Sequence, residues 1–232
     1  MICIAPSILS CDFARLGEEA QAIKEAGAPW LHVDVMDGHF VPNLSLGVPV
    51  VQSLRRATDL FLDTHLMITD PQKYIEPFYK AGADLITFHA EANGDPMETI
   101  ALIRSFGAQV GLAISPDTPV EQVFPYLHLV DLLLVMTIYP GFGGQKFMPE
   151  TAEKIEAAAR FRQEQGLNFL IEVDGGINAD TASTVAERGA AVLVAGSAVF
   201  GKPDYRQAIE AIRLPAEQAA KIGRKQIIRA FR

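Results

Sequence analysis

The chain has 232 residues, of which 49% are hydrophobic and 21% charged, and this balance indicates a globular protein and excludes a disordered one. Its formal net charge of −8 argues against a nucleic-acid-binding protein, because such proteins are usually basic. The longest apolar run, at 129–136, is interrupted by Asp131 and is far shorter than the roughly 18 residues of a membrane span. We therefore expect neither nucleic acid nor membrane among its partners.

The N-terminus and the cysteines together predict a cytoplasmic protein. Residues 1–6 lead directly into a predicted strand and lack the basic and apolar segments of a signal peptide. The two cysteines, Cys3 and Cys11, lie in no metal-binding spacing. We expect both to be reduced, as is usual in the cytosol.

Apolar runs alternate with segments of helical periodicity along the whole chain. Predicted strands lie at 2–8, 30–36, 61–67, 85–89, 110–114, 132–136, 169–173 and 192–195. Predicted helices lie at 16–26, 48–57, 72–81, 96–106, 119–126, 149–165, 180–188 and 204–213. Eight such units in one chain favour an α/β fold, a single (β/α)8 TIM barrel that forms one domain over 1–232. An open doubly wound sheet is the alternative, but no GxGxxG motif follows the first strand.

The C-terminal segment, 215–232, is predicted to be a further helix or a tail. After Glu217 it contains only basic charged residues, which are Lys221, Arg224, Lys225, Arg229 and Arg232. A solvated basic face or a frayed tail is the favoured interpretation, and a contact with a partner or another subunit is the alternative.

Polar residues lie at the ends of three predicted strands. Side chains alternate along a strand, so His32, Asp34 and Met36 share one face of the second strand. His65 lies near the end of the third strand, and Asp174 directly follows the seventh. Barrel enzymes place their reactive groups at the carboxyl ends of the strands, so we expect these side chains to meet on one rim.

The meeting of His32, Asp34, His65 and Asp174 predicts a metal site. Two imidazole nitrogens and two carboxylate oxygens suit one divalent cation, which could be Zn²⁺, Fe²⁺, Mn²⁺ or Co²⁺. For any one of these residues alone, a structural role in the core or a turn would be the better interpretation.

Glycine-rich segments follow the last three predicted strands and suggest a phosphate site. They are Gly141-Phe142-Gly143-Gly144, Gly175-Gly176 and Gly196-Ser197. Loops at this position in barrels often bind phosphate through backbone N–H groups. A metal beside a phosphate site indicates a phosphorylated carbonyl substrate: the metal polarises the carbonyl group, and the carboxylates move a proton on the adjacent carbon.

Several segments resemble the ribulose-phosphate 3-epimerase family. They are SILS at 7–10, HVDVMDGHFVPN at 32–43, DTHLM at 63–67, PGFGGQKF at 140–147, VDGGI at 173–177 and VAGS at 194–197. The likeness extends over about residues 2–210. It implies an isomerase of carbohydrate metabolism that interconverts D-ribulose 5-phosphate and D-xylulose 5-phosphate, and it favours a homo-oligomer.

The resemblance also implies roles for individual residues. Asp34 and Asp174 match the two acid/base carboxylates, which would act on opposite faces of C3 through a cis-enediolate, and with His32 and His65 they match the ligands of the metal. The expected substrate-binding residues are Ser7, Met36, His65, Met67, Met136, Gly141, Phe142, Gly143, Gly144, Asp174, Gly175, Gly176, Gly196 and Ser197. For the three methionines, plain core packing is the alternative.

Three residues depart from the family pattern, and they leave the sugar open. Tyr139 and Ser115 stand where the family often has asparagine, and Cys11 stands where it usually has a small residue. An epimerase of a six-carbon sugar such as D-allulose 6-phosphate is therefore an alternative. A related barrel lyase is disfavoured, because Val35 and Met36 follow Asp34 where such enzymes have Asp-x-Lys-x-x-Asp. A non-catalytic binding barrel is the last alternative.

Overall fold

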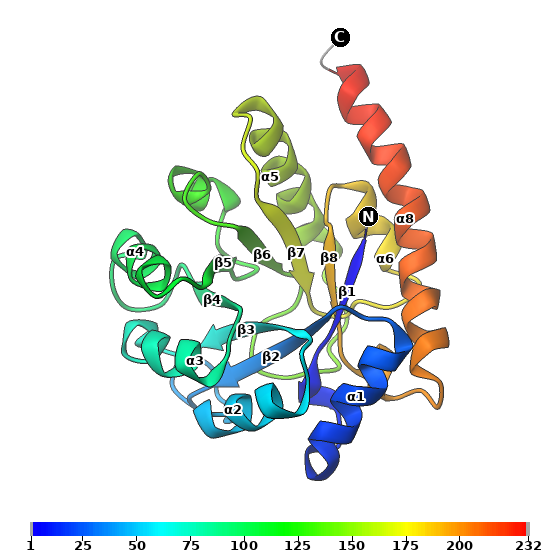
Figure 1. Ribbon diagram of the computed structural model, residues 1–232. Helices are drawn as coiled ribbons and strands as arrows, with labels where there is room; N and C mark the ends of the chain where they lie inside the picture. Colours follow the sequence, from blue (N-terminus) through cyan, green and yellow to red (C-terminus); the bar gives the residue numbers. More distant parts are fainter. Residues whose placement is uncertain (1, 231–232) are drawn as a thin grey trace.

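Eight parallel strands form the centre of the molecule, as the computed structural model shows for the described residues, 2–230 (Figure 1). The strands are β1 (Cys3–Pro6), β2 (Trp30–Met36), β3 (Phe61–Met67), β4 (Leu85–His89), β5 (Gln109–Ile114), β6 (Leu132–Met136), β7 (Leu170–Asp174) and β8 (Val192–Ala195). Each strand from β2 to β7 pairs with the next one along the chain, and β1 pairs with β8. The predicted (β/α)8 barrel is confirmed.

The barrel closes between its first two strands just after β1 ends. Ser7 forms an isolated parallel bridge with His32 of β2. This bridge completes the ring that the β1–β8 pairing begins. Its position matters for the site, because it brings the Ser7 side chain to the face of β2 that carries Asp34.

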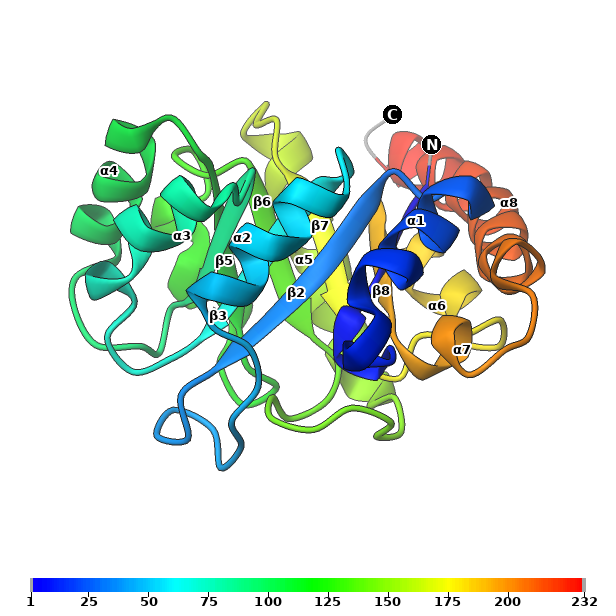
Figure 2. The same ribbon diagram turned by 60° about the horizontal axis from the view of Figure 1, so that its bottom comes forward.

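Helices surround the sheet on its outer side (Figures 1 and 2). The α-helices are α1 (Leu16–Ala26), α2 (Val48–Ala57), α3 (Ile75–Ala81), α4 (Pro96–Phe106), α5 (Ala152–Glu164), α6 (Ala182–Glu187), α7 (Ser197–Phe200) and α8 (Tyr205–Ala230). Five 3-10 segments join them: η1 (Ile8–Ser10), η2 (Phe13–Arg15), η3 (Pro71–Lys73), η4 (Val120–Tyr126) and η5 (Pro149–Thr151). None of the helices in the described part of the chain is long and apolar enough to cross a membrane.

Local sequence signals explain where the helices begin and end, and α4 is a clear case. The Asp95 side chain accepts a hydrogen bond from the backbone N–H of Met97, and Pro96 occupies the first turn, where its missing N–H costs nothing. Gly107 ends the helix at φ +95°, in the left-handed conformation that glycine adopts most easily. These signals predicted the bounds of α4 correctly.

Two apolar layers hold the barrel together. The larger layer lies between the sheet and the helices and includes Val33 and Val35 of β2. A smaller layer inside the barrel includes Leu134 of β6 and Val194 of β8. Alternation along β2 therefore directs the valines outward and the polar residues inward, as predicted.

Most strand bounds agree with the prediction, and the differences are small. Strand β1 is shorter than predicted, β5 begins one residue earlier, and β7 ends on Asp174 instead of before it. The segment predicted as a helix at 119–126 is the 3-10 segment η4, which contains Pro125. Because proline has no N–H to donate, a regular α-helix is disfavoured there.

The C-terminal segment required a larger correction. The predicted helix end at 213 is wrong, because α8 continues through Pro215 to Ala230 as one helix. It packs against α6 and α1, and this tertiary contact outweighs the backbone hydrogen bond that Pro215 cannot donate. The side chains of Arg224, Lys225 and Arg229, and the whole of Arg232, lie outside the described residues.

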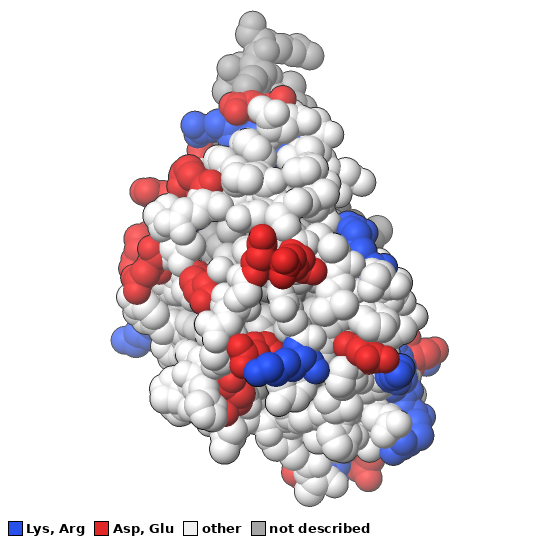
Figure 3. Space-filling model, turned by 90° about the vertical axis from the view of Figure 1, so that its left-hand side faces the viewer, with Lys and Arg blue, Asp and Glu red and all other residues white. Residues whose placement is uncertain are grey.

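The surface carries mixed charges. Figure 3 shows acidic side chains scattered among uncharged ones, with Lys and Arg interspersed, over the side of the molecule that lies to the left in Figure 1. The described part of this face offers no broad basic area of the kind that binds nucleic acid.

Candidate active site

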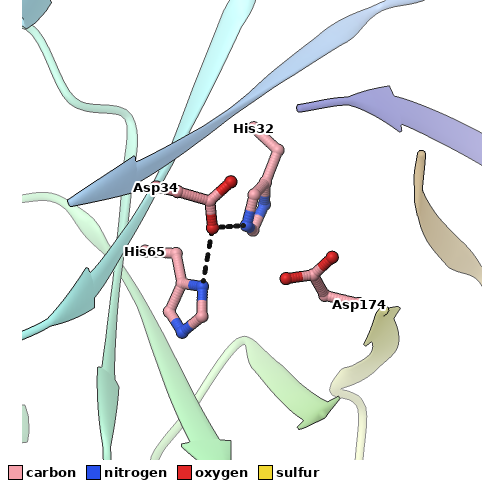
Figure 4. A group of neighbouring side chains, drawn as sticks. All are labelled: His32, Asp34, His65 and Asp174. Carbon is pink, nitrogen blue, oxygen red and sulfur yellow. Dashed lines mark hydrogen bonds and ion pairs between the residues drawn. The ribbon is translucent and has the colours of Figure 1, made fainter. Parts of the chain in front are cut away.

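Asp34 lies at the centre of the predicted rim cluster (Figure 4). Its Oδ1 atom lies 3.3 Å from His32 Nε2 and 3.3 Å from His65 Nδ1. Its Oδ2 atom accepts a hydrogen bond of 2.5 Å from Ser7 Oγ. All four side chains are buried, and neighbouring strands position them: β2 carries His32 and Asp34, β3 carries His65, and Ser7 follows β1.

Asp174 faces this cluster from the end of β7 (Figure 4). One ligand atom from each of His32, Asp34, His65 and Asp174 can be chosen so that all four lie within 4.8 Å of one another. The sequence prediction that these four residues converge is therefore confirmed. The cluster forms a possible site for a divalent cation.

The chemistry of the four residues fits such a cation. His32 Nε2 is buried and has no hydrogen-bond partner, although it faces the carboxylate of Asp34. A buried nitrogen without a partner is costly in an apolar interior, and a bound cation would remove that cost. Two imidazoles and two carboxylates form a common ligand set for zinc and related metals.

Two further carboxylates lie behind His32. Asp63 Oδ2 is 2.5 Å from His32 Nδ1, and Glu172 Oε1 lies 3.9 Å from the same nitrogen. Because a carboxylate can only accept, Asp63 favours the tautomer with the proton on Nδ1 and directs the Nε2 lone pair into the cluster. Sequence reasoning missed Asp63 and Glu172. Their spacing could have revealed them, since each lies two positions before a predicted site residue, on the same strand face.

The surroundings drive the pKa values of the two aspartates apart. Burial alone would raise the pKa of Asp34, but the charge of His32, 3.3 Å away, together with the hydrogen bond of His65, holds that pKa well below its usual value. Burial and the negative charge of Asp34 raise the pKa of Asp174 to about 7. One carboxylate is thus kept ionised while the other is able to hold a proton near neutral pH.

The two histidines also differ. Burial lowers the pKa of His65 to about 4 against the opposing hydrogen bond of Asp34, so this imidazole is neutral at pH 7. Burial lowers the pKa of His32 as well, but Asp63 and Asp34 outweigh it and raise the pKa well above its usual value. Without a cation, His32 therefore holds a proton that a cation would have to displace.

A cavity of about 720 Å³ opens above the cluster, at the carboxyl ends of the strands. Every predicted substrate-binding residue lines it except His65, which lies buried beneath. These residues are Ser7, Met36, Met67, Met136, Gly141, Phe142, Gly143, Gly144, Asp174, Gly175, Gly176, Gly196 and Ser197. Sequence reasoning did not select Ser10, Lys146, Asn178, Thr181 and Lys202, which also line it.

Two of the glycines have no room for a side chain. A Cβ atom on Gly176, at φ +66°, would lie 2.4 Å from the backbone nitrogen of Phe147. A Cβ on Gly196 would lie 2.5 Å from Ser10 Oγ. The chain therefore approaches the cavity wall at these points with bare backbone, as a site that binds anions through N–H groups requires.

The loop after β2 is ordered by Asp37 and reaches the glycine-rich loop after β6. Asp37 accepts hydrogen bonds from the backbone N–H groups of His39, Phe40 and Thr69. Asn43 Nδ2 donates a 2.7 Å hydrogen bond to the carbonyl oxygen of Gly141. Both loops extend from the lower edge of the barrel in Figure 2.

Fold and site together define a (β/α)8-barrel enzyme whose reactive groups lie at the carboxyl ends of the strands. Solved structures with the same fold include 3-hexulose-6-phosphate synthase (TM-score 0.66, 20% identity, 92% of this chain and 98% of that chain). Another is KGPDC from Streptococcus mutans (TM-score 0.71, 14% identity, 94% of this chain and 98% of that chain). At such low identity these likenesses establish the fold alone.

Sequence comparison identifies the family. The model of the ribulose-phosphate 3 epimerase family matches residues 3–200. Ribulose-phosphate 3-epimerase of Synechocystis is 50% identical over 214 residues, which cover 91% of this chain and 93% of that protein. The enzyme of the same name from Bacillus subtilis is also 50% identical, over 92% of this chain and 99% of that protein. The chain belongs to the ribulose-phosphate 3-epimerase family, and the sequence predictions of this family and of an isomerase are confirmed.

Proposed function

We propose that this enzyme interconverts D-ribulose 5-phosphate and D-xylulose 5-phosphate: one of Asp34 and Asp174 removes the proton from C3, and the other donates a proton to the opposite face of C3. The observation that carries the mechanism is the placement of these two carboxylates in one cavity wall with pKa values driven apart. Inverting a carbon needs an acid and a base on opposite faces, because a single base would return the proton to the side it came from. An ionised and a protonated carboxylate supply this pair.

The proton transfer proceeds in two steps. The ionised aspartate takes the C3 proton, and the electron pair of the broken C–H bond moves toward the C2 carbonyl to form a planar cis-enediolate. The protonated aspartate then donates its proton to the opposite face of C3 and is left ionised. Both steps run in reverse for the other sugar, so each aspartate is an acid in one direction and a base in the other.

His32, Asp34, His65 and Asp174 would hold one divalent cation, for which Zn²⁺, Fe²⁺, Mn²⁺ and Co²⁺ are all suitable. When bound, such a cation polarises a carbonyl group and stabilises the negative charge that develops on its oxygen. Ser7 supports this arrangement from the protein side, because its hydrogen bond fixes Asp34 Oδ2 while Oδ1 faces the two histidines.

Three buried methionines contribute to the apolar part of the cavity wall. Met36, Met67 and Met136 are all buried, at 5%, 1% and 1% exposure, and all line the cavity. Their thioether side chains would exclude water from the enediolate, which otherwise could exchange its proton or decompose. The same three methionines also pack in the core, so they combine a structural role with the exclusion of water.

The glycine-rich part of the cavity wall would hold the phosphate group. It comprises Gly141–Gly144, Gly175, Gly176, Gly196 and Ser197. The bare backbone at Gly176 and Gly196 supports this assignment. Lys146 and Lys202 also line the cavity and add positive charge in a protein of net charge −8.

A coupled assay on purified, metal-loaded protein tests the reaction. We expect turnover of D-ribulose 5-phosphate that Asp174→Asn reduces by about three orders of magnitude, as the loss of a general acid/base commonly does. D-allulose 6-phosphate belongs in the same assay. A preference for the six-carbon sugar would keep the mechanism and change the substrate, and no turnover of either sugar would refute the proposal.

We propose a cytoplasmic homo-oligomer built from one barrel domain over 1–232. The single eight-stranded sheet supports one domain, and a relative from rice, 49% identical, is named as a cytoplasmic isoform. A relative from Arabidopsis, 47% identical, is named as chloroplastic, so location differs within the family. Light scattering would determine the number of subunits.

A further inference from the structure

A chain of three side chains leads from His65 to the loop beyond β4. His65 Nε2 lies 2.9 Å from His89 Nε2, and His89 Nδ1 lies 3.0 Å from Glu91 Oε2. Both imidazoles are buried, at 0% and 1% exposure, and their rings stack with centroids 5.1 Å apart. The Phe40 ring covers His89 at 4.8 Å between centroids, so water has little access to the pair. We call His65, His89 and Glu91 the relay.

The far end of the relay is firmly held. Glu91 Oε1 accepts a 2.8 Å hydrogen bond from the backbone N–H of Ser115 and another from the hydroxyl of Thr118. Burial alone would raise the pKa of Glu91, but the hydrogen bond and charge of His89, with these further donors, lower it to about 2. Glu91 is therefore an ionised acceptor whose second oxygen is directed at His89.

The proton positions follow from the carboxylate. Because an ionised carboxylate only accepts hydrogen bonds, His89 carries a proton on Nδ1. With its proton on Nδ1, His89 can accept at Nε2 from His65 Nε2–H. A cation bound to His65 Nδ1, the nitrogen that faces Asp34, would leave the proton of His65 on Nε2, where it needs this acceptor.

We propose that Glu91, acting through His89, is a positioning residue that sets the tautomer of His65 and directs its Nδ1 lone pair into the metal site. This inference rests on the metal site of the proposed function. It gives a role to His89 and Glu91, which are not metal ligands, and Glu91 lies in the loop after β4.

His32 shows the same arrangement in a shorter form. Asp63 contacts His32 Nδ1 directly, at 2.5 Å, and leaves Nε2 facing Asp34. His65 is turned the other way, with Nδ1 toward the site, so its outer nitrogen points to His89 instead of a carboxylate. A carboxylate thus acts on both histidines: Asp63 contacts His32 directly, whereas Glu91 acts on His65 through His89.

Two variants break the relay, and a third is the control. Glu91→Gln keeps the size of the side chain but removes its charge, and His89→Leu leaves His65 Nε2–H buried without an acceptor. Lys154→Met is the control, because Lys154 Nζ donates to the backbone carbonyls of Ser115, Pro116 and Thr118. It loosens the loop that holds Glu91 without touching the relay itself.

The experiment measures the dissociation constant of Mn²⁺ for metal-stripped protein, from the electron paramagnetic resonance signal of free Mn²⁺. Loss of a residue that orients a metal ligand commonly weakens binding about tenfold to a hundredfold. We expect a loss in this range for Glu91→Gln and His89→Leu and less than about threefold for Lys154→Met, which removes no such residue. Equal binding by all variants, or an equal loss in the control, would overturn the relay.

A second measurement needs no variant. Nitrogen-15 chemical shifts of His65 and His89 in the Zn²⁺-loaded wild-type protein show which ring nitrogens carry protons, and the relay requires protons on His65 Nε2 and on His89 Nδ1. A proton on His89 Nε2 would overturn the relay even if the variants bind Mn²⁺ weakly. If the wild-type protein binds neither Mn²⁺ nor Zn²⁺, the metal site of the proposed function fails, whereas equal binding by the wild type and the variants overturns the relay alone.

Discussion

Ser7 and Asp34, 27 positions apart in the sequence, are joined by a 2.5 Å hydrogen bond from Ser7 Oγ to Asp34 Oδ2. The bond exists because the bridge between Ser7 and His32 closes the barrel at this point. It favours the ionised form of Asp34 and fixes the plane of its carboxylate. The same contact between β1 and β2 thus closes the barrel and orients the carboxylate of Asp34.

Ser7→Ala should lower kcat/KM for the pentulose phosphate. A hydrogen bond to a charged group contributes about 1.5–3 kcal/mol, which corresponds to a loss of roughly tenfold to a hundredfold. Steady-state kinetics measure the effect. Ser45→Ala is the matched control, because Ser45 Oγ donates to the backbone carbonyl of Asp34 at 2.6 Å and not to its carboxylate. An equal loss in both variants would show that the Ser7 bond to the carboxylate has no special role.

Asp34→Asn and Asp174→Asn should each still remove the C3 proton from one of the two sugars but no longer interconvert them. With one carboxylate removed, the other can still take the C3 proton of the one sugar whose C–H bond faces it. We expect each variant to exchange that proton with solvent deuterium without net epimerisation, and the two variants to act on opposite epimers. Proton NMR in D₂O measures this. Exchange of both sugars by one variant would contradict the two-face mechanism.

Removal of the cation should abolish turnover reversibly. Treatment with a chelator followed by dialysis should reduce activity to below about 1% of the starting value, because polarisation of a carbonyl by a cation contributes several kcal/mol. Adding back Zn²⁺, Mn²⁺, Fe²⁺ or Co²⁺ one at a time identifies the best cation. Full activity in protein that elemental analysis shows to be free of metal would refute the metal site.

Binding of Mn²⁺ should strengthen as the pH rises from 5.5 to 7.5. The pKa of Asp174 is raised to about 7 and that of His32 is raised well above its usual value, so both hold protons in the lower part of this range. Protons compete with the cation for these ligands. For each proton that the cation displaces, the affinity for Mn²⁺ therefore falls by about tenfold when the pH is lowered by one unit. Titrations followed by electron paramagnetic resonance check the slope, and a flat profile would contradict the raised pKa values.

Gly223→Ala should destabilise the packing of α8 on α6. A Cβ on Gly223 would lie 1.8 Å from the carbonyl oxygen of Glu187, so the helices must separate. Overpacking of this kind costs about 1–3 kcal/mol, partly offset by roughly 1 kcal/mol of better helix propensity. Thermal unfolding measures the net change. Gly17→Ala in α1 is the control, because its nearest neighbour, Ala57 Cβ, would lie 3.5 Å away, and it should be neutral or stabilising.

Local signals in the sequence predicted most of the helices and strands and the identity of the rim residues. The predicted bounds of β2, β3, α1, α2 and α4 match those of the structure, because buried parallel strands are continuously apolar and helix ends carry local capping signals. Alternation along β2 and β3 placed His32, Asp34 and His65 on the inner face, since the side-chain period of a strand is two.

Which side chains contact one another depends on how the elements pack, and the sequence pattern does not show it. The contact of His65 with His89 depends on the register of β3 against β4, and that of Ser7 with Asp34 depends on where the barrel closes. The course of α8 through Pro215 depends on its packing against α6, which no local signal reports. The local sequence governs whether a segment forms a helix or a strand and which of its side chains face the core. The distances between elements depend on how all of the elements pack together.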